Sequence, residues 1–242
     1  LDVLEKVELY FYRSTDKVVA VTPAFKRNLS ARGIEEAKVE VVPNGANLGL
    51  FASQATDKAL KQDLGLNGEF VISYIGTHGL AHSLPFIVRS ISHIQDPDIH
   101  FVFIGDGAEK QRTMQVARDM DLSNVTFLDP VPKNEVKRYL SISDLSLVPL
   151  KKADTFTTVI PSKIFESSAM RVPILLGVEG QAREIVEEHG AGVFFEPEDT
   201  ASFVQAVRRV KQDQDLYARL QDGCASLAQA YDRKKLAHQM LE

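Results

Sequence analysis

The sequence predicts an α/β fold: a Rossmann-like, doubly wound parallel sheet of about six strands, with helices at the C-terminal end. From about residue 69, short apolar runs are separated by longer segments that carry apolar residues at helical spacing. The short runs are rich in β-branched and aromatic residues and nearly free of charge, which is typical of strands buried on both faces. Strands that alternate with helices indicate a parallel sheet.

Strands and helices alternate in the middle of the chain, and only helices are expected after them. Residues 199–242 contain no strand-like run, and their apolar spacing predicts two or three helices that cover the sheet. Six strands are expected at residues 70–75, 100–104, 124–128, 145–149, 173–176 and 192–195, with helices between them at 84–94, 109–120, 134–141 and 181–189.

Residues 1–51 have a separate pattern. A strand is expected at 17–22, followed by a helix whose start is marked by Thr22 as N-cap and Pro23 at the first helical position, and which ends near Gly33. A second strand at 39–42 runs into a Pro-Asn-Gly turn. We therefore predict that residues 1–51 are the tail of an N-terminal domain or a hinge, and that residues 52–242 form a second domain after a polar linker.

Composition excludes several classes of protein. With 242 residues, 44% hydrophobic and 25% charged, the chain is an ordinary globular one and neither disordered nor collagenous. No apolar stretch is long enough to span a bilayer, and no signal peptide is expected. The net charge of −5 gives no reason to expect nucleic-acid binding. Cys224 is the single cysteine, so no internal disulfide is possible. The first residue is not methionine, and this suggests that the sequence is a fragment.

Candidate ligand-binding loops follow the predicted strands, because open parallel sheets bind ligands at the carboxyl ends of their strands. The first strand runs into residues 76–82, where Gly76 and Gly79 would let backbone amides approach an anion. The loop also contains His78 and His82, which have metal-ligand spacing but lie in a glycine-rich stretch, so no metal is expected. The loop lacks a G-x-G-x-x-G fingerprint and a P-loop lysine, so a tight turn explains its glycines equally well.

The next two loops carry weaker signals. Asp106 lies between two glycines and is expected to cap the helix that begins near residue 109. The segment around Val131 is stiffened by prolines, and its backbone could hydrogen-bond a base edge. Pro132 as the residue before a helix is an equally good explanation.

Residues 155–174 are the most informative stretch. Pro161 and Ser162 mark a helix start, where free backbone amides favour an anion. Lys163 adds a full positive charge, so a diphosphate would be well bound here. Glu166 lies on the same side of the helix, and a carboxylate can accept two hydroxyl hydrogen bonds, as from a ribose. The alternative is a capping box in which Ser162 and Glu166 only stabilise the helix.

The order of these motifs resembles the C-terminal, nucleotide-sugar-binding half of a family 4 (group 1) retaining glycosyltransferase with the GT-B fold. The resemblance extends over nearly the whole chain. The segments that carry it are 18–22, 39–47, 102–109, 124–128, 139–144 and 161–174, the last with the sequence Pro-Ser-Lys-Ile-Phe-Glu at its start.

The resemblance implies a role for each matching residue. Glu166 matches the second glutamate of a Glu-x7-Glu motif and would bind the ribose, and it is expected with Lys163 to be catalytic. Val131 would lie next to the base of the nucleotide. The residues expected at the donor diphosphate are Gly76, Thr77, Gly79, His82, Ser162 and Lys163.

Three positions depart from the family pattern. Thr158 stands where the first glutamate would contact the donor sugar, and Thr77 and His82 replace an arginine and a lysine. Stabilisation of the leaving diphosphate is therefore expected to rest on Lys163, with Lys151 or Lys152 in support.

The implied activity is transfer, with retention, of a hexosyl or N-acetylhexosaminyl group from a nucleotide-sugar, with a UDP-sugar as the first expectation. The acceptor would be a glycan or lipid-linked glycan bound by a missing N-terminal domain, in surface polysaccharide synthesis in the cytoplasm or at the inner face of the cytoplasmic membrane. Neither a cofactor nor a metal is expected, and the fragment alone would not turn over. The alternatives are a non-catalytic nucleotide-sugar-binding module and a sugar-nucleotide epimerase of GT-B fold.

Overall fold

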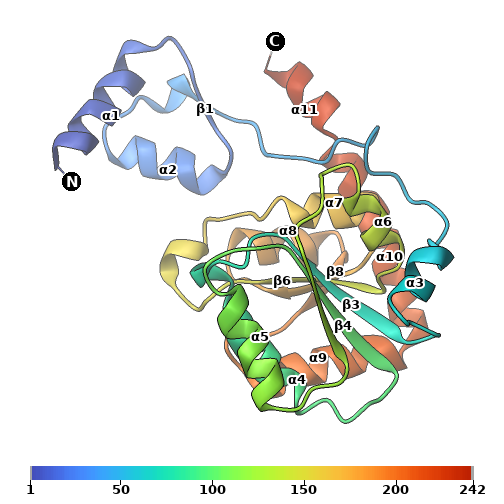
Figure 1. The fold of residues 1–242 in the computed structure, drawn as a ribbon. Coiled ribbons are helices and arrows are strands. Elements are labelled where there is room, and N and C mark those ends of the chain that lie inside the picture. Colours follow the sequence, from blue (N-terminus) through green and yellow to red (C-terminus); the bar gives the residue numbers. More distant parts are fainter. Residues whose placement is uncertain (1, 241–242) are drawn as a thin grey trace. The chain divides into compact units, whose positions relative to one another are not determined.

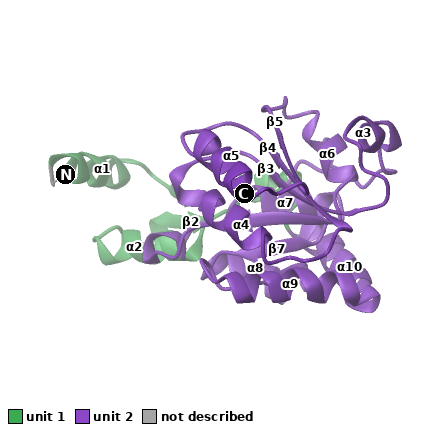
Figure 2. Ribbon diagram, turned by 60° about the horizontal axis from the view of Figure 1, so that its bottom comes forward, with its two compact units in different colours: residues 1–45, 231–242 green, residues 46–230 purple. Residues whose placement is uncertain are grey.

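A computed structural model describes residues 2–240 (Figure 1). The chain divides into two compact units (Figure 2): unit 1 is Leu1–Gly45 with Tyr231–Glu242, and unit 2 is Ala46–Ala230. The division differs from the expected domains, because residues 46–51 belong to unit 2 and the described residues from Tyr231 onward belong to unit 1. The domain boundary at 51/52 stays a prediction.

Unit 1 is built around two short parallel strands, β1 (Val18–Ala20) and β2 (Val39–Val41). Thr22 caps α2 as expected, because its hydroxyl accepts a hydrogen bond from the Phe25 backbone N–H at 3.1 Å. The sequence reasoning missed the first helix. The helices of unit 1 are α1 (Asp2–Ser14), α2 (Pro23–Ala31), the 3-10 turn η1 (Glu36–Lys38) and α11 (Arg233–Gln239).

Unit 2 contains the predicted parallel sheet, which confirms the fold class. The strand order is β5-β4-β3-β6-β7-β8, so the winding direction reverses between β3 and β6. The strands are β3 (Phe70–Ile75), β4 (Ile99–Ile104), β5 (Val125–Leu128), β6 (Leu145–Pro149), β7 (Ile174–Gly177) and β8 (Gly192–Phe194). Every pair is parallel, and Ile72 of β3 stands opposite Leu145 of β6.

Helices cover both faces of this sheet (Figure 1). One face packs α4, α5 and α9 around the aromatic residues of β3 and β4, and the other packs α3 and α6 against Val71, Val102 and Ile104. The helix α3 was not predicted. The helices of unit 2 are α3 (Lys58–Asp63), α4 (Leu84–Ile91), α5 (Lys110–Asp119), α6 (Val136–Ser141), α7 (Lys163–Ala169), α8 (Gln181–Glu188), α9 (Thr200–Gln212) and α10 (Gln214–Ala230), with 3-10 turns η2 (Leu80–His82) and η3 (Asp154–Phe156).

The alternation of buried side chains explains this arrangement. Tyr74 and Phe103 point to one face of the sheet, whereas Val71 and Ile104 point to the other. Because both faces are covered, the strands carry few charged residues. Across residues 2–240, no helix is long and apolar enough to cross a membrane.

Candidate functional site

A cavity of about 380 Å³ lies in unit 2 at the carboxyl ends of β3 and β4. Its walls come from the loops after β3, β4 and β5 and from α6 and α7, and Ser146 of β6 also contributes. The cavity therefore lies where the winding of the sheet reverses, which is the place where open α/β sheets bind ligands. Five of the expected site residues line it: Gly76, Thr77, Val131, Lys163 and Glu166.

Glycines allow the loops after β3 and β4 to approach each other closely. A Cβ on Gly105, whose φ is +144°, would lie 1.9 Å from the carbonyl oxygen of Gly76. The two loops are joined by the His78 backbone N–H, which donates to the Asp106 carbonyl at 2.8 Å. A Cβ on Gly76 would lie 3.1 Å from Nζ of Lys163. The tight-turn interpretation of the glycines is thus correct in part, and Gly76 also leaves room for the lysine.

Lys163 places a cation inside the cavity wall without a hydrogen-bond partner. Its Nζ is buried and lies 3.9 Å from the centre of the Tyr74 ring. Burial lowers the pKa of this ammonium to about 7, because the charged form loses its hydration. An anion that bound next to this nitrogen would strongly stabilise the buried ammonium form.

Glu166 lies one turn further along α7 and faces Lys133. The Nζ of Lys133 donates a hydrogen bond to Oε1 of Glu166, and the Glu166 side chain is only 11% exposed. Ser162 is the N-cap of α7 but makes no capping hydrogen bond through its side chain. The capping-box interpretation is therefore wrong, and Glu166 is directed toward the cavity.

Lys133, Ser146 and Ser167 line the cavity but were not singled out from the sequence. Ser167 donates a hydrogen bond to the Ser146 hydroxyl at 2.7 Å. A signal for Lys133 was present, since a basic residue follows the proline segment around Val131. Nothing in the sequence pattern pointed to the two serines.

The other expected site residues, Gly79, His82, Ser162 and Thr158, do not line the cavity. His82 packs against the edge of Tyr74, its Nδ1 is buried without a partner, and burial lowers its pKa to about 4. Thr158 follows a turn that is held to α8, where the Gln181 N–H donates to the Thr157 carbonyl at 2.9 Å. Sites assigned to these residues stay predictions.

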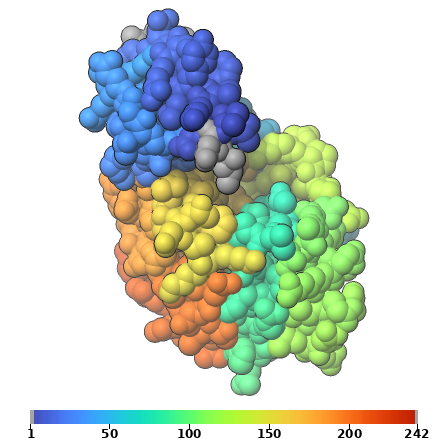
Figure 3. All heavy atoms as spheres, turned by 90° about the vertical axis from the view of Figure 1, so that its left-hand side faces the viewer, coloured from blue at the N-terminus to red at the C-terminus, as the bar shows by residue number. Residues whose placement is uncertain are grey.

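The loop after β6 lies beside the loop after β3. The Lys151 backbone N–H donates to the Ala81 carbonyl at 2.8 Å, and Figure 3 shows the yellow surface of this region next to the teal surface of residues near 80. Lys152, however, pairs through Nζ with Glu196 at 2.6 Å. In this structure Lys152 is engaged away from the cavity, and Lys151 is exposed.

Asp106 does not cap α5, which corrects the expectation for this residue. Its carboxylate accepts a hydrogen bond from the neighbouring Gly107 N–H at 2.8 Å, and the N-cap is Glu109, without a side-chain bond. Asp106 instead borders the cavity. Within residues 2–240, no three histidine, cysteine or acidic side chains are grouped as a metal site would require.

Two family models match the chain. The model described as "Glycosyl transferases group 1" matches residues 56–224, and the one described as "Glycosyltransferase Family 4" matches residues 2–50. A putative teichuronic acid biosynthesis glycosyltransferase of Bacillus subtilis is 26% identical over 72% of this chain and 43% of its own length. A putative colanic acid biosynthesis glycosyl transferase of Escherichia coli K12 is 24% identical over 81% of this chain and 49% of its own length. The chain thus spans about half the length of these relatives.

Solved structures share the fold. Anabaena Alr3699/HepE in complex with UDP and glucose superposes with a TM-score of 0.83 at 18% identity, over 95% of this chain and 63% of that one. The C-terminal domain of a group 1 glycosyl transferase, LpcC of Francisella tularensis, gives a TM-score of 0.64 at 16% identity, over 78% of this chain and all of that domain. The GT-B resemblance is confirmed at the level of fold. Because the group 1 model matches most of the sequence, this chain belongs to the group 1 glycosyl transferases.

Proposed function

We propose that this chain is the donor-binding half of a retaining glycosyltransferase that moves a hexosyl or N-acetylhexosaminyl group from a nucleotide-sugar to a glycan or lipid-linked acceptor. One observation carries the proposal. Lys163 and Glu166, three residues apart on α7, both line a cavity at the switch point of the sheet, the first as a buried cation without a hydrogen-bond partner. Such a pair fits a diphosphate next to a ribose.

In this mechanism the chain's main contribution is electrostatic. As the bond between the anomeric carbon and the phosphate oxygen breaks, negative charge builds up on the departing diphosphate. The Lys163 ammonium, buried in the cavity wall, would stabilise this charge more strongly than it could in bulk solvent. Gly76 and Thr77 would face the same phosphates, Glu166 the ribose and Val131 the base. The lysine takes the role of the counter-ion, so we propose that no metal is required.

Names of related proteins support the biological setting. The two bacterial relatives are named for teichuronic acid and colanic acid biosynthesis, and one structural neighbour was solved with UDP and glucose. We therefore propose surface polysaccharide synthesis from a UDP-sugar, in the cytoplasm or at the inner face of the cytoplasmic membrane.

The acceptor would be bound by residues outside this sequence. Unit 1 supports this view, because five apolar side chains of α1 are exposed along one face: Val3, Leu4, Val7, Tyr10 and Phe11. An apolar helix face of this kind is normally covered by further structure.

Titration calorimetry with UDP, UDP-N-acetylglucosamine and a GDP-sugar tests the donor site. We expect binding of at least one of these ligands, with or without EDTA. Lys163→Ala should weaken it by about 1.5 to 3 kcal/mol, the value of a charge-assisted hydrogen bond. Lys17→Ala, an exposed lysine of unit 1, is the control and should bind as the parent does. Absence of binding to all three ligands by the folded chain would contradict the proposal.

A non-catalytic nucleotide-sugar-binding module is the second candidate, favoured by Thr158 at the position of the first family glutamate. Incubation of a longer protein, with an acceptor domain present, separates the two. Donor hydrolysis or transfer supports the enzyme, whereas tight binding without turnover supports the module. Interconversion of donor epimers without acceptor would instead support an epimerase.

A further inference from the structure

The cavity contains one feature that the proposed function does not use, the pairing of Lys133 with Glu166. Lys133 comes from the loop after β5 and Glu166 from α7, and the hydrogen bond joins Nζ to Oε1. The Lys133 side chain is 59% exposed, whereas that of Glu166 is 11% exposed. The ammonium also lies 5.3 Å from the centre of the Phe51 ring. The pair therefore presents an acceptor and a donor side by side at the cavity wall.

A vicinal diol needs both kinds of partner. Each ribose hydroxyl donates one hydrogen bond and accepts others, whereas a carboxylate can only accept and an ammonium can only donate. Glu166 alone would satisfy the hydroxyl hydrogens and leave the hydroxyl oxygens without a donor. A carboxylate next to an ammonium satisfies both.

The other side-chain donors near Glu166 form no hydrogen bond with its carboxylate. The Ser167 hydroxyl donates to Ser146 at 2.7 Å. Lys163 lies against the Tyr74 ring and forms no ion pair with Glu166 within 4.0 Å. Among the charged side chains that line the cavity, Lys133 is thus the donor closest to the carboxylate.

We propose that Lys133 and Glu166 together recognise the 2′,3′-diol of the donor ribose, so that Lys133 makes the site selective for ribonucleotides over 2′-deoxyribonucleotides. This inference rests on the proposed donor site. On ligand binding the Lys133 ammonium keeps its place beside Glu166 and donates to a ribose oxygen, while the two carboxylate oxygens accept from the hydroxyl groups. No proton is transferred.

The experiment compares UDP with 2′-deoxy-UDP, and GDP with 2′-deoxy-GDP, by titration calorimetry on the whole chain. For the parent protein we expect the ribonucleotide to bind about tenfold more tightly or better. Lys133→Met should weaken ribonucleotide binding about tenfold and deoxynucleotide binding less than twofold, so that the preference largely disappears. Lys133→Gln retains an N–H donor and should keep part of the preference.

Lys17→Met is the matched control, because Lys17 has the same 59% side-chain exposure and is also paired with a glutamate, Glu40. It should leave all four affinities unchanged. Because the Glu166 side chain is only 11% exposed, thermal unfolding of both Lys133 variants is measured beside the titrations. Lys133→Gln keeps an N–H donor for the carboxylate and should match the parent.

The possible outcomes separate the two proposals. If Lys133→Met binds the ribonucleotide as tightly as the parent or more tightly, the ammonium only competes for Glu166 and the inference is overturned. Equal weakening of both nucleotides would mean that Lys133 acts on the phosphates, which also overturns it. If the parent binds none of the four nucleotides, the donor site itself fails and this inference falls with it.

Discussion

The two ends of the six-stranded sheet differ in whether all their named polar groups have hydrogen-bond partners. At the amino ends of the strands the Asp144 carboxylate accepts from the Val71 N–H at 2.7 Å, and the Asn124 amide donates to the Ile99 carbonyl at 3.1 Å. At the carboxyl ends Nζ of Lys163 and Nδ1 of His82 are buried without hydrogen-bond partners. The carboxyl ends thus combine paired groups, such as Lys133 with Glu166, with buried groups that have no hydrogen-bond partner.

This difference is informative because an unpaired buried polar group costs about 1 to 3 kcal/mol. Polar groups that serve the fold are expected to have partners inside the protein, as Asp144 does. Groups that are kept unpaired next to a cavity are suited to a partner from outside. The contrast thus supports a ligand site at the carboxyl ends, and the following variants test it from the largest expected effect to the smallest.

Gly105→Ala should have the largest effect on stability. The new Cβ would lie 1.9 Å from the Gly76 carbonyl oxygen at a φ of +144°, so strain and overlap together should lower the free energy of unfolding by about 3 kcal/mol or more. Gly65→Ala is the control, since Gly65 has a φ of +69° but nothing within 4 Å of a Cβ. Its cost should be about 1 kcal/mol. Similar losses in urea unfolding of both variants would show that the loops separate easily.

Lys163→Met should lower donor affinity without lowering the free energy of unfolding. Donor affinity is expected to fall about ten- to a hundredfold through loss of the charge. The free energy of unfolding should stay the same or rise, because a buried unpaired amine is replaced by an apolar side chain of similar length.

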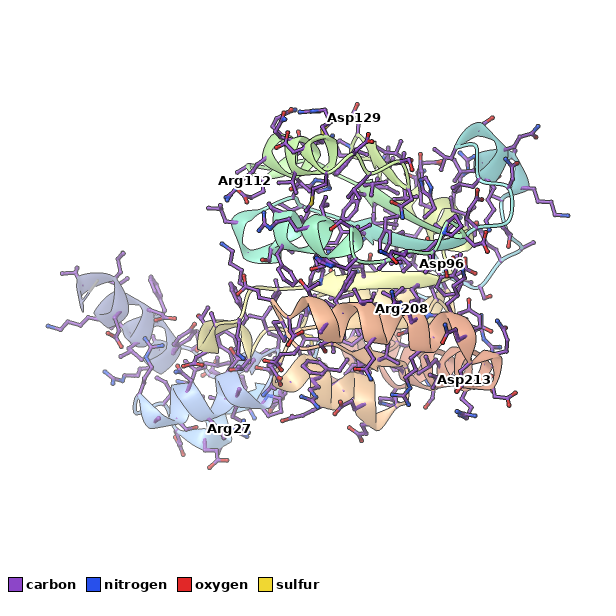
Figure 4. The ribbon with its side chains drawn as sticks, turned by 90° about the horizontal axis from the view of Figure 1, so that it is seen from below. Arg27, Asp96, Arg112, Asp129, Arg208 and Asp213 are labelled. Carbon is purple, nitrogen blue, oxygen red and sulfur yellow. The ribbon has the colours of Figure 1, made fainter. Side chains whose placement is uncertain are left out.

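Lys110→Met is the matched control for this variant. Lys110 is also buried, but its ammonium pairs with Asp129 at 2.7 Å, and Figure 4 shows Asp129 beside the helix α5 that carries Lys110. Its replacement should lower stability and leave donor affinity nearly unchanged. A stability loss for Lys163→Met as large as that for Lys110→Met would contradict the contrast between paired and unpaired groups.

Asp144→Ala tests the hydrogen bond that Asp144 makes at the amino ends of the strands. The Val71 N–H loses its partner, so the free energy of unfolding should fall by about 1 to 3 kcal/mol, while donor affinity changes less than twofold. Asp144→Asn keeps an acceptor oxygen and should lose less. A clear loss of affinity at unchanged stability would mean that this end of the sheet is coupled to the site.

Changes in pH should give a smaller effect per pH unit, with opposite signs for stability and binding. The pKa of Lys163 is lowered by burial to about 7 from 10.5, so between these values the unfolded chain binds more protons than the folded one. This group therefore makes stability rise with pH across that window, by at most about 1.4 kcal/mol per pH unit. Donor affinity should fall above pH 7 as the ammonium loses its proton.

Chemical denaturation and calorimetry at several pH values measure both trends. In the Lys163→Met variant, the free energy of unfolding should rise less with pH between about 7 and 10.5 than in the parent, and donor affinity should fall less above pH 7. If the variant and the parent show the same dependence of donor affinity on pH, Lys163 does not titrate in the site.

Local patterns in the sequence determined the type and order of most elements. The six strands lie within one or two residues of their expected ranges, because strands buried on both faces require unbroken apolar runs. Thr22 caps α2 as predicted, since capping depends on neighbours only three residues away. Lys163 and Glu166 could also be placed on one helix from their spacing, and the motif order pointed to the family that the group 1 model confirms.

The tertiary structure decided which polar groups have partners. Lys133 and Glu166 are 33 residues apart in the sequence, and Lys163 of α7 packs on the Tyr74 ring of β3 without a hydrogen-bond partner. The expected roles of Asp106 as a helix cap and of Ser162 with Glu166 as a capping box were wrong. The Asp106 carboxylate accepts from the adjacent Gly107 N–H, and the Ser162 side chain makes no capping hydrogen bond. Periodicity indicates which face of an element is apolar. A hydrogen bond between side chains from separate loops, such as Lys133 and Glu166, requires the two atoms to come within about 3 Å, and the packing of the elements sets that distance.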